Sequence, residues 1–232
     1  MLTEQTRSHA QLEFGARAGR IVFDVRKAAY LPDCQTLLVA DLHFEKASYL
    51  QAVGGAPLPA FDTDDTLRRL QALIADYQPD HVAALGDSFH DIDAGARLQT
   101  DHFEAMNRLV SGVKRFTWIL GNHDPDIPAG LNGAQEDHIE CGRFLLTHLP
   151  VDPLYDDGVN ICGHLHPKVR IATRRRRVSA PCFAVSDTRI IMPSFGTYTG
   201  GLEITHDAIQ SELPGRRAYF AATRSGLISL SG

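Results

Sequence analysis

The sequence predicts an α/β fold, and three observations lead to this prediction. In the first half of the chain, short apolar runs alternate with amphipathic helical segments. Each of these apolar runs ends in polar residues. After residue 125 the pattern changes to short strands with tight connections. The order β-α-β-α-β in the first half is typical of a parallel sheet with crossover helices. The strand-rich second half predicts a second sheet packed on the first.

The elements of the first half follow from their apolar patterns. Residues 1–19 lack clear periodicity and are either loosely ordered or lie across the edge of the fold. Strands are expected at 21–25, 36–40, 81–85 and 118–120. A helix over 44–53 ends at Gly54. Two further helices start near 62 and 101, and their apolar positions repeat with the helical period: Leu67, Leu70, Leu73 and Ile74, then Phe103, Met106, Leu109 and Val110.

The second half is expected to contain mainly strands. Their ranges are 143–148, 159–163, 168–173, 182–185, 189–192, 201–205 and parts of 219–230. The chain has no internal repeat, low-complexity tract or flexible linker. We therefore expect residues 1–232 to form a single domain.

Composition excludes several classes of protein. With 44% hydrophobic and 22% charged residues, the 232-residue chain has an ordinary globular balance. A net charge of −5 does not favour general binding to polyanions. No apolar run is long enough to span a membrane, and the polar residues 1–11 do not resemble a signal peptide, so we expect a cytoplasmic protein. The four cysteines, without C-x-x-C spacing, are expected to be free and mostly buried in a reducing compartment.

Polar clusters at the ends of the apolar runs predict a metal site. They contain five of the eleven histidines, and their members are Asp41, His43, Asp87, Asn122, His123, Asp124, His148, His164 and His166. A lone aspartate at a strand end more often caps a helix or turn, but five such clusters in register argue for a shared site. Alternation in the segment His164-Leu165-His166 places both imidazoles on one side if the segment is extended.

The number and type of donors indicate two metal ions. The set exceeds what one tetrahedral zinc ion needs, and it suits two divalent ions that share a carboxylate. Nitrogen and oxygen donors without thiolate favour Mn²⁺, Fe²⁺ or Zn²⁺. Water held between two such cations loses a proton near neutral pH and becomes a nucleophile.

The ordered motifs resemble those of the calcineurin-like binuclear metallophosphoesterase superfamily. They are Asp41-x-His43, Gly86-Asp87, Gly121-Asn122-His123-Asp124, Thr147-His148 and Gly163-His164-x-His166, with Thr147 standing where the superfamily usually has glycine. The resemblance implies a four-layer α/β/β/α sandwich of the metallo-dependent phosphatase type. It also implies one metal on Asp41, His43 and His166, and another on Asn122, His148 and His164, with Asp87 bridging the two.

The same resemblance implies catalytic roles for two further residues. His123 would not bind metal but would stabilise charge on the phosphoryl oxygens or protonate the leaving oxygen. Asp124 would orient His123.

Three further segments are similar to one bacterial branch, the DNA ligase-associated metallophosphoesterases, also called DNA damage response endonucleases. The segments are 40–47 (ADLHFEKA), 85–91 (LGDSFHD) and 193–201 (PSFGTYTGG). This similarity implies Mn²⁺-dependent cleavage of DNA phosphodiesters and a repair function shared with a DNA ligase, a helicase and an exonuclease.

Substrate contacts are less clearly indicated. Arg174 and Arg175 begin a run of four arginines that would contact phosphate or form a solvated turn. His90 would face the substrate or cap the adjacent helix. Phe195 and Tyr198 would stack on bases or, as we favour, pack the glycine-rich turn.

Two other functions compete with DNA cleavage. A phosphatase or nucleotide phosphodiesterase acting on small molecules would use the same site, and the acidic net charge suits it. An interaction module similar to the retromer subunit of this fold would have lost metal binding, whereas all seven ligand positions are present here.

Overall fold

The first half of the chain builds a seven-stranded sheet. The computed structural model describes residues 8–14, 19–55, 58–172 and 177–231. The strand order is β1-β2-β3-β4-β5-β6-β7. The strands are β1 (His9–Phe14), β2 (Gly19–Asp24), β3 (Ala28–Leu31), β4 (Thr36–Val39), β5 (His81–Leu85), β6 (Arg115–Ile119) and β7 (Ala134–Glu136). Strands β4 to β6 are parallel, as the β-α-β-α-β pattern predicts, and β7 continues this parallel set. Strands β1 to β3 add an antiparallel edge.

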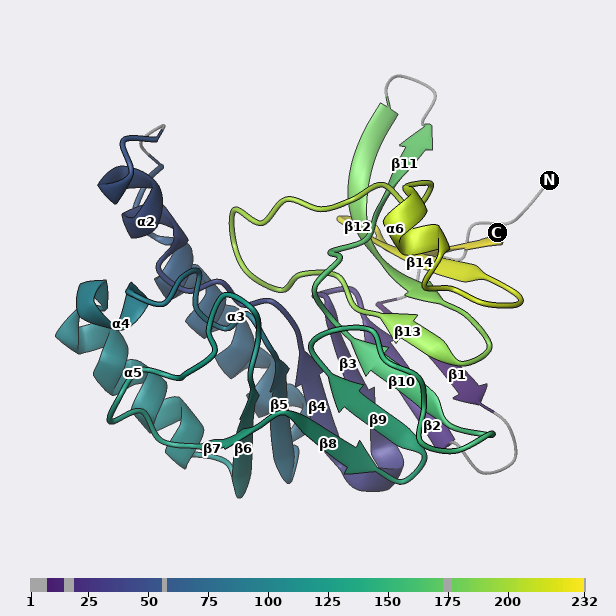
Figure 1. Ribbon diagram of the computed structural model, residues 1–232, viewed down its shortest axis with the longest axis horizontal. Coiled ribbons are helices and arrows are strands. Elements are labelled where there is room, and N and C mark those ends of the chain that lie inside the picture. The colour runs from purple at the N-terminus through teal and green to yellow at the C-terminus, as the bar shows by residue number, and fades with distance from the viewer. Residues whose placement is uncertain (1–7, 15–18, 56–57, 173–176, 232) are drawn as a thin grey trace.

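Helices cover one face of this sheet (Figure 1). They are α2 (Lys46–Ala52), α3 (Asp62–Tyr77), α4 (Ala94–Arg97) and α5 (Thr100–Ser111), and the 3₁₀ turn η1 (Pro32–Cys34) precedes β4. Alternate residues of β4 show why both faces are buried. Leu37 and Val39 pack with the helices, among residues such as Leu70, whereas Leu38 lies in the cluster between the two sheets.

The second half of the chain forms an eight-stranded sheet with the order β15-β14-β12-β13-β10-β9-β8, to which β11 is added through β12. Its strands are β8 (His138–Cys141), β9 (Phe144–Thr147), β10 (Val159–Cys162), β11 (Lys168–Ala172), β12 (Arg177–Val185), β13 (Arg189–Ile191), β14 (Ala218–Thr223) and β15 (Gly226–Ser231). Its inner face contacts the first sheet through side chains such as Leu146, Ile161 and Phe183, with Phe183 stacked on Phe23 at 4.4 Å.

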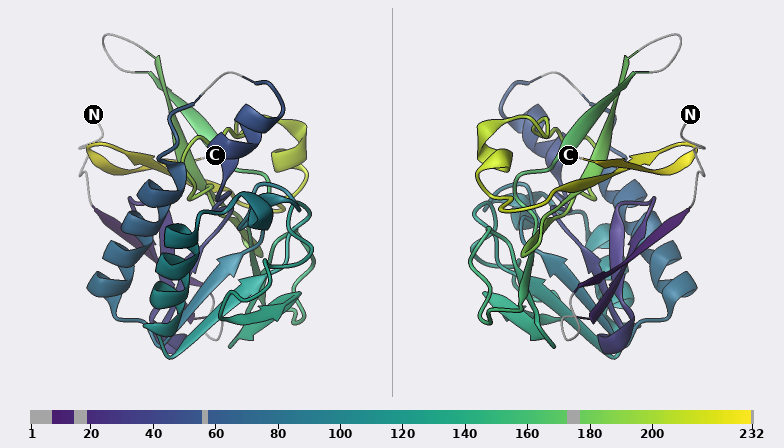
Figure 2. Two further views of the ribbon diagram at one scale, coloured as in Figure 1. Left: turned by 90° about the vertical axis from the view of Figure 1, so that its left-hand side faces the viewer. Right: turned by 90° about the vertical axis from the view of Figure 1, so that its right-hand side faces the viewer.

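The outer face of the second sheet is covered by the short helix α6 (Asp207–Gln210) and the chain around it. Ile209 and Leu213 pack there against Cys162, Ala184 and Ile191. In the left view of Figure 2, helices α3 and α5 stand in front of the strands. The predicted α/β/β/α class is confirmed, with a fourth layer much smaller than the first.

Some local predictions differ from the structure. The segment 201–205 is not a strand and makes only an isolated bridge between Glu203 and Lys168, because the chain turns there toward α6. Strands β3, β7 and β8 were not predicted; β7 and β8 are largely exposed and therefore contain no apolar run. Of the two alternatives for residues 1–19, the edge position is correct for β1, which pairs with β2 along its whole length.

The expectation of free thiols is wrong for two of the four cysteines. Cys34, at the end of η1, and Cys141, at the end of β8, form a disulfide with their Cα atoms 6.3 Å apart. The two sheets bring these ends together, although the residues lie 107 positions apart in the sequence. Cys162 and Cys182 are free and buried, as expected. Among the described residues, no helix is long and apolar enough to cross a membrane.

Candidate metal centre

The polar clusters predicted at the strand ends lie together in the structure. Asp41 and His43 follow β4, Asp87 follows β5 and Asn122 follows β6, three parallel neighbours in the first sheet. His148 follows β9, and His164 and His166 follow β10, its parallel neighbour in the second sheet. Because the carboxyl ends of parallel strands meet at one edge, each sheet delivers its polar residues to a single place.

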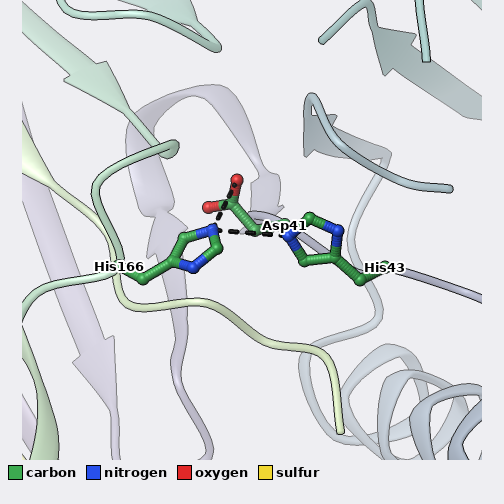
Figure 3. Close-up of side chains that lie close together, drawn as sticks. All are labelled: Asp41, His43 and His166. Atoms are coloured by element: carbon green, nitrogen blue, oxygen red, sulfur yellow. Dashed lines mark hydrogen bonds and ion pairs between the residues drawn. The ribbon is translucent and has the colours of Figure 1, made fainter. Parts of the chain in front are cut away.

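The first cluster consists of Asp41, His43 and His166 (Figure 3). His166 Nε2 lies 3.2 Å from Asp41 Oδ1 and 3.5 Å from His43 Nε2. Asp41 is fully buried and His43 is 3% exposed. Three donor atoms therefore converge on one point, with Asp41 and His43 buried and His166 18% exposed.

The second cluster consists of Asp87, His148 and His164, joined by Asn122. His148 Nε2 is its centre, at 3.0 Å from Asn122 Oδ1, 3.2 Å from His164 Nδ1 and 3.3 Å from Asp87 Oδ1. His148 Nδ1 lies 3.1 Å from the carbonyl oxygen of Leu85, to which it can only donate. This hydrogen bond fixes the tautomer that leaves Nε2 free to bind a metal.

The two clusters adjoin each other. The backbone N–H of His164 donates to both oxygens of Asp41, at 3.0 and 3.1 Å. Asp41 Oδ1 also lies 3.8 Å from His148 Nδ1. A residue of the second cluster thus holds the carboxylate of the first.

Unusual backbone conformations coincide with these side chains. Ten non-glycine residues in the described chain have positive φ, and half of them are expected ligands: Asp41, His43, Asp87, His164 and His166. A non-glycine residue in this region is strained by its Cβ, and such strain concentrates at functional sites. The surrounding fold therefore imposes the positions of these ligands.

The expectation of an extended segment at His164-Leu165-His166 is wrong. Both histidines are left-handed, with φ of 68° and 45°, and the segment forms a turn. The turn sends His164 to the second cluster and His166 to the first. The two imidazoles therefore serve different clusters, as the family resemblance implies.

Electrostatics favours the protonation states that metal ligands need. Burial, together with the neighbouring His166, lowers the pKa of His43 to about 2, so this imidazole is neutral. Burial alone would raise the pKa of the Asp87 carboxyl, but the hydrogen bond and charge of His148 outweigh it and hold the pKa below its ordinary value. A neutral imidazole and an ionised carboxylate are the forms that bind divalent ions.

The donor set fits two divalent cations. All the converging atoms are nitrogen or oxygen, and within each cluster the His and Asp donor atoms lie within 4.8 Å of one another. Both clusters combine a carboxylate with imidazoles, which suits Mn²⁺, Fe²⁺ or Zn²⁺.

Gly86 lies where the backbone approaches the second cluster closely. Its φ is +72°, and a Cβ added there would lie 2.3 Å from His148 Cγ. We expect Gly86→Ala to weaken metal binding by about 10- to 100-fold, as loss of ligand orientation does in other metal sites. Gly142→Ala is the matched control, because Gly142 has a φ of +65° and a Cβ there would meet nothing within 4 Å. Titration with Mn²⁺ should separate the two variants, and equal affinities would show that His148 does not depend on this close approach.

His123 lies beside the clusters without joining either. Its side chain is 45% exposed, and Nε2 is 4.0 Å from Asp87 Oδ2. Nδ1 lies 3.0 Å from the carbonyl oxygen of His90, and the backbone N–H donates to Asp87 Oδ1 at 2.9 Å. This position over the metal centre is the one that the family resemblance implies for His123.

The role expected for Asp124 needs correction. Its carboxylate accepts the backbone N–H groups of Ser88, Phe89 and Gly121, at 2.6, 3.1 and 3.0 Å. The tight turn after β6 buries Asp124 beneath the loops, so the carbonyl of His90 and not Asp124 orients the His123 ring. Burial raises the pKa of Asp124 to about 7, the nearby Asp87 adds to this rise, and the three N–H groups oppose it.

His90 faces the metal centre. Its Nδ1 is 3.3 Å from His43 Nδ1, and its ring stacks on His123 with centroids 5.7 Å apart and planes 12° apart. The alternative, a cap on the next helix, is wrong because α4 has no side-chain cap and begins after Asp93. Arg174 and Arg175 lie outside the described residues.

The packing expected for the glycine-rich turn is confirmed for Phe195. Phe195 is fully buried, beneath the guanidinium of Arg69 at 4.4 Å. Tyr198 donates its hydroxyl to the carbonyl of Pro59 at 3.1 Å and lies against Phe61. Phe195 is therefore closed to a base, whereas Tyr198 also lines the hollow beside His166.

The turn also supports the metal centre in a way that the sequence motifs did not indicate. Ser194 Oγ and the N–H of Gly196 both donate to the carbonyl of Asp41, at 2.8 and 3.1 Å. A Cβ on Gly196 would lie 2.1 Å from the carbonyl oxygen of Leu42, so only glycine permits this approach. The loop therefore holds the backbone that carries Asp41 and His43.

Hollows open on both sides of the metal centre. On the side of Asn122 and His148 lies one of about 610 Å³, with Leu149, Val151 and Leu154 in its lining. On the side of His166 lies a larger one of about 1050 Å³. The clusters therefore lie between two accessible surfaces.

Comparison with known proteins identifies the family. The family model described as calcineurin-like phosphoesterase matches residues 35–178, which is more than half of the chain and contains every residue of both clusters. The chain belongs to this family. It is therefore a metal-dependent hydrolase of phosphoester bonds, and its two clusters indicate two divalent metal ions.

Two solved structures are similar to this calcineurin-like phosphoesterase. Nuclease MPE from Pseudomonas putida is 27% identical, with a TM-score of 0.73, over 96% of this chain and 100% of that one. Yfce, a phosphoesterase from E. coli, is 14% identical, with a TM-score of 0.44, over 84% of this chain and 98% of that one. Among curated proteins, none gives a significant match. The likeness to nuclease MPE is consistent with the resemblance to the ligase-associated branch.

Proposed function

We propose that this phosphoesterase is a Mn²⁺-dependent endonuclease that cleaves DNA phosphodiesters in repair. The observation that carries the proposal is the likeness to a nuclease, which extends over nearly the whole of both chains at 27% identity. The ligase-associated motifs at 40–47, 85–91 and 193–201 support it independently. They also lead us to propose a cytoplasmic role alongside a DNA ligase, a helicase and an exonuclease.

The hollows on both sides of the metal centre support a polymeric substrate. A strand that enters on one side and leaves on the other would place one phosphodiester at the clusters. The groups Asp41, His43 and His166 would hold one cation, and Asn122, His148 and His164 the other, with Asp87 between them. When bound, two such cations supply charge neutralisation at the phosphate and a water of lowered pKa.

The remaining side chains would position and protonate the substrate. Nδ1–H of His123 donates to the carbonyl of His90, which leaves Nε2 to face an oxygen of the phosphate. His90 keeps the His123 ring in place by stacking on it. Asp124 fixes the loops beneath through its three backbone hydrogen bonds.

A small-molecule phosphatase or nucleotide phosphodiesterase is the second candidate, favoured by the net charge of −5. One experiment separates the two. Metal-stripped protein is reloaded with Mn²⁺ and given closed circular single-stranded DNA, or nucleotide and aryl mono- and diesters, with His123→Ala in parallel. Nicking of the circle by the wild type but not by the variant supports the endonuclease. Hydrolysis of the esters with an intact circle would establish the small-molecule enzyme.

A further inference from the structure

The larger hollow beside the metal centre has a basic lining. It contains Lys27, Arg69, Lys168 and Arg224, and we call it the basic groove. Lys27 comes from the turn between β2 and β3, Arg69 from α3, Lys168 from the start of β11 and Arg224 from the turn between β14 and β15. Residues far apart in the sequence thus bring four cationic side chains to one hollow.

The charge of the groove lining is positive, whereas the net charge of the whole chain is negative. Against three full cations, Arg69, Lys168 and Arg224, and the partly charged Lys27 stands one carboxylate, Asp65, whereas the protein carries a net charge of −5. Asp65 is already engaged, since it accepts from Arg69 Nε at 2.9 Å and from the Thr197 hydroxyl at 2.8 Å. Lys168 and Arg224 form no ion pair with any described residue. The groove therefore has a local positive excess that favours an anion.

Lys27 and Arg69 are held in fixed positions. Lys27 Nζ and Arg69 Nη2 donate to the carbonyl of Phe195 at 2.8 and 2.9 Å. Within the described chain, Arg69 Nη1 has no hydrogen-bond acceptor, so the guanidinium keeps a donor for a ligand. Burial lowers the pKa of Lys27 to about 7, and the neighbouring Arg69 contributes to this. An anion in the groove would relieve the repulsion between the two cations.

The groove is also fixed relative to the metal centre. Its wall includes Ser194 and Gly196, which both donate to the carbonyl of Asp41. It also includes His166, a member of the first cluster and only two residues before Lys168. A phosphate bound in the groove would therefore be a neighbour of a phosphate bound at the clusters.

We propose that the basic groove binds a second, non-reacting backbone phosphate of the substrate strand, next to the phosphodiester that is cleaved. The inference rests on the proposed function, because only a polynucleotide carries phosphodiesters on both sides of a nucleoside. Nucleoside monophosphates and aryl esters have one phosphate group and cannot use the groove in this way. The groove would therefore select polynucleotides over small esters. It would do so although the net charge of −5 does not attract polyanions.

The test compares two pairs of charge removals. The double variant Lys168→Gln/Arg224→Gln removes two groove cations and spares Lys27 and Arg69, which also hold the loop beneath Asp41. The control Lys114→Gln/Arg216→Gln removes the same charge from side chains that are 75% and 95% exposed and pair with Asp80 and Asp187. Binding of a fluorescein-labelled single-stranded oligonucleotide is followed by anisotropy over a range of salt concentrations in EDTA. Nicking of circular DNA is measured separately with Mn²⁺.

The groove variant is expected to bind the oligonucleotide about tenfold more weakly than the control. Its plot of log affinity against log salt should be shallower by about 0.7 for each phosphate that the groove no longer neutralises. If the wild type binds and nicks DNA but the two double variants behave alike, the groove proposal is wrong and the endonuclease stands. If the wild type itself neither binds the oligonucleotide nor nicks the circle, yet hydrolyses small esters, both the groove proposal and the proposed function are wrong.

Discussion

Replacing Asp87 by asparagine is expected to lower phosphodiester turnover by about a thousandfold or more, with loss of at least one metal ion. The Asp87 carboxylate lies 3.3 Å from His148 Nε2 at the centre of the second cluster and is 2% exposed. Asparagine has the same shape but no charge, so two cations would lose the anion that stands between them. Charge stabilisation by bound metal contributes several kcal/mol to the transition state, and each 1.4 kcal/mol is a factor of about ten in rate.

The measurement combines turnover with the metal content of the purified protein after Mn²⁺ loading. Asp62→Asn is a suitable control, because Asp62 is also buried and accepts a backbone hydrogen bond, from Ala47, at the start of α2. The control should keep two ions per chain. An Asp87→Asn protein with full metal content and wild-type turnover would show that the carboxylate does not bridge the metals.

The residues of the two clusters could be found from the sequence because they stand just after apolar runs. The run ending at Val39 leads into Asp41, and the run ending at Ile119 leads into Asn122. The carboxyl ends of neighbouring parallel strands lie at the same edge of the sheet, so residues that follow such strands lie close together. Their proximity could therefore be predicted without knowledge of side-chain positions. The same logic located His148 and His164 in the second sheet, whose strands β9 and β10 are also parallel.

The role of Asp124 could not be predicted in this way. Which partner a turn residue contacts depends on the dihedral angles of the turn, and these are not encoded in spacing. Here the carboxylate points to the amides of Ser88 and Phe89 in a neighbouring loop, 36 and 35 residues away. The left-handed backbone at His164 and His166 escaped prediction for the same reason; at His164 it accompanies the hydrogen bond from the backbone N–H to Asp41.

The basic groove and the disulfide were missed because they are purely tertiary features. Lys27 and Arg224 are nearly two hundred positions apart in the sequence and carry no common motif. Cys34 and Cys141 have no spacing that marks a pair. The arginine run at 174–177 drew attention because it is local, whereas the charges beside His166 are assembled only by the fold.

Removing the imidazole of His123 is expected to separate catalysis from metal binding. His123→Ala should lower turnover by about 10²- to 10³-fold, the usual effect of losing one group that stabilises developing charge. Both metal ions should remain, because the ring belongs to neither cluster and is 45% exposed. Its Nδ1 faces a carbonyl, which can only accept, so Nδ1 carries a hydrogen and Nε2 is the atom left for substrate.

Two other substitutions serve as references for this result. His206→Ala removes an imidazole that caps α6, where Nδ1 accepts the N–H of Ala208 at 3.2 Å, and should leave turnover unchanged. Asp87→Asn should lose metal and activity together, whereas His123→Ala should lose activity alone. A His123→Ala protein with normal turnover would remove this residue from the reaction. A His123→Ala protein that has lost both ions would show that His123 is part of the metal centre. In that case the stacking of His90 on the His123 ring would hold a metal ligand in place.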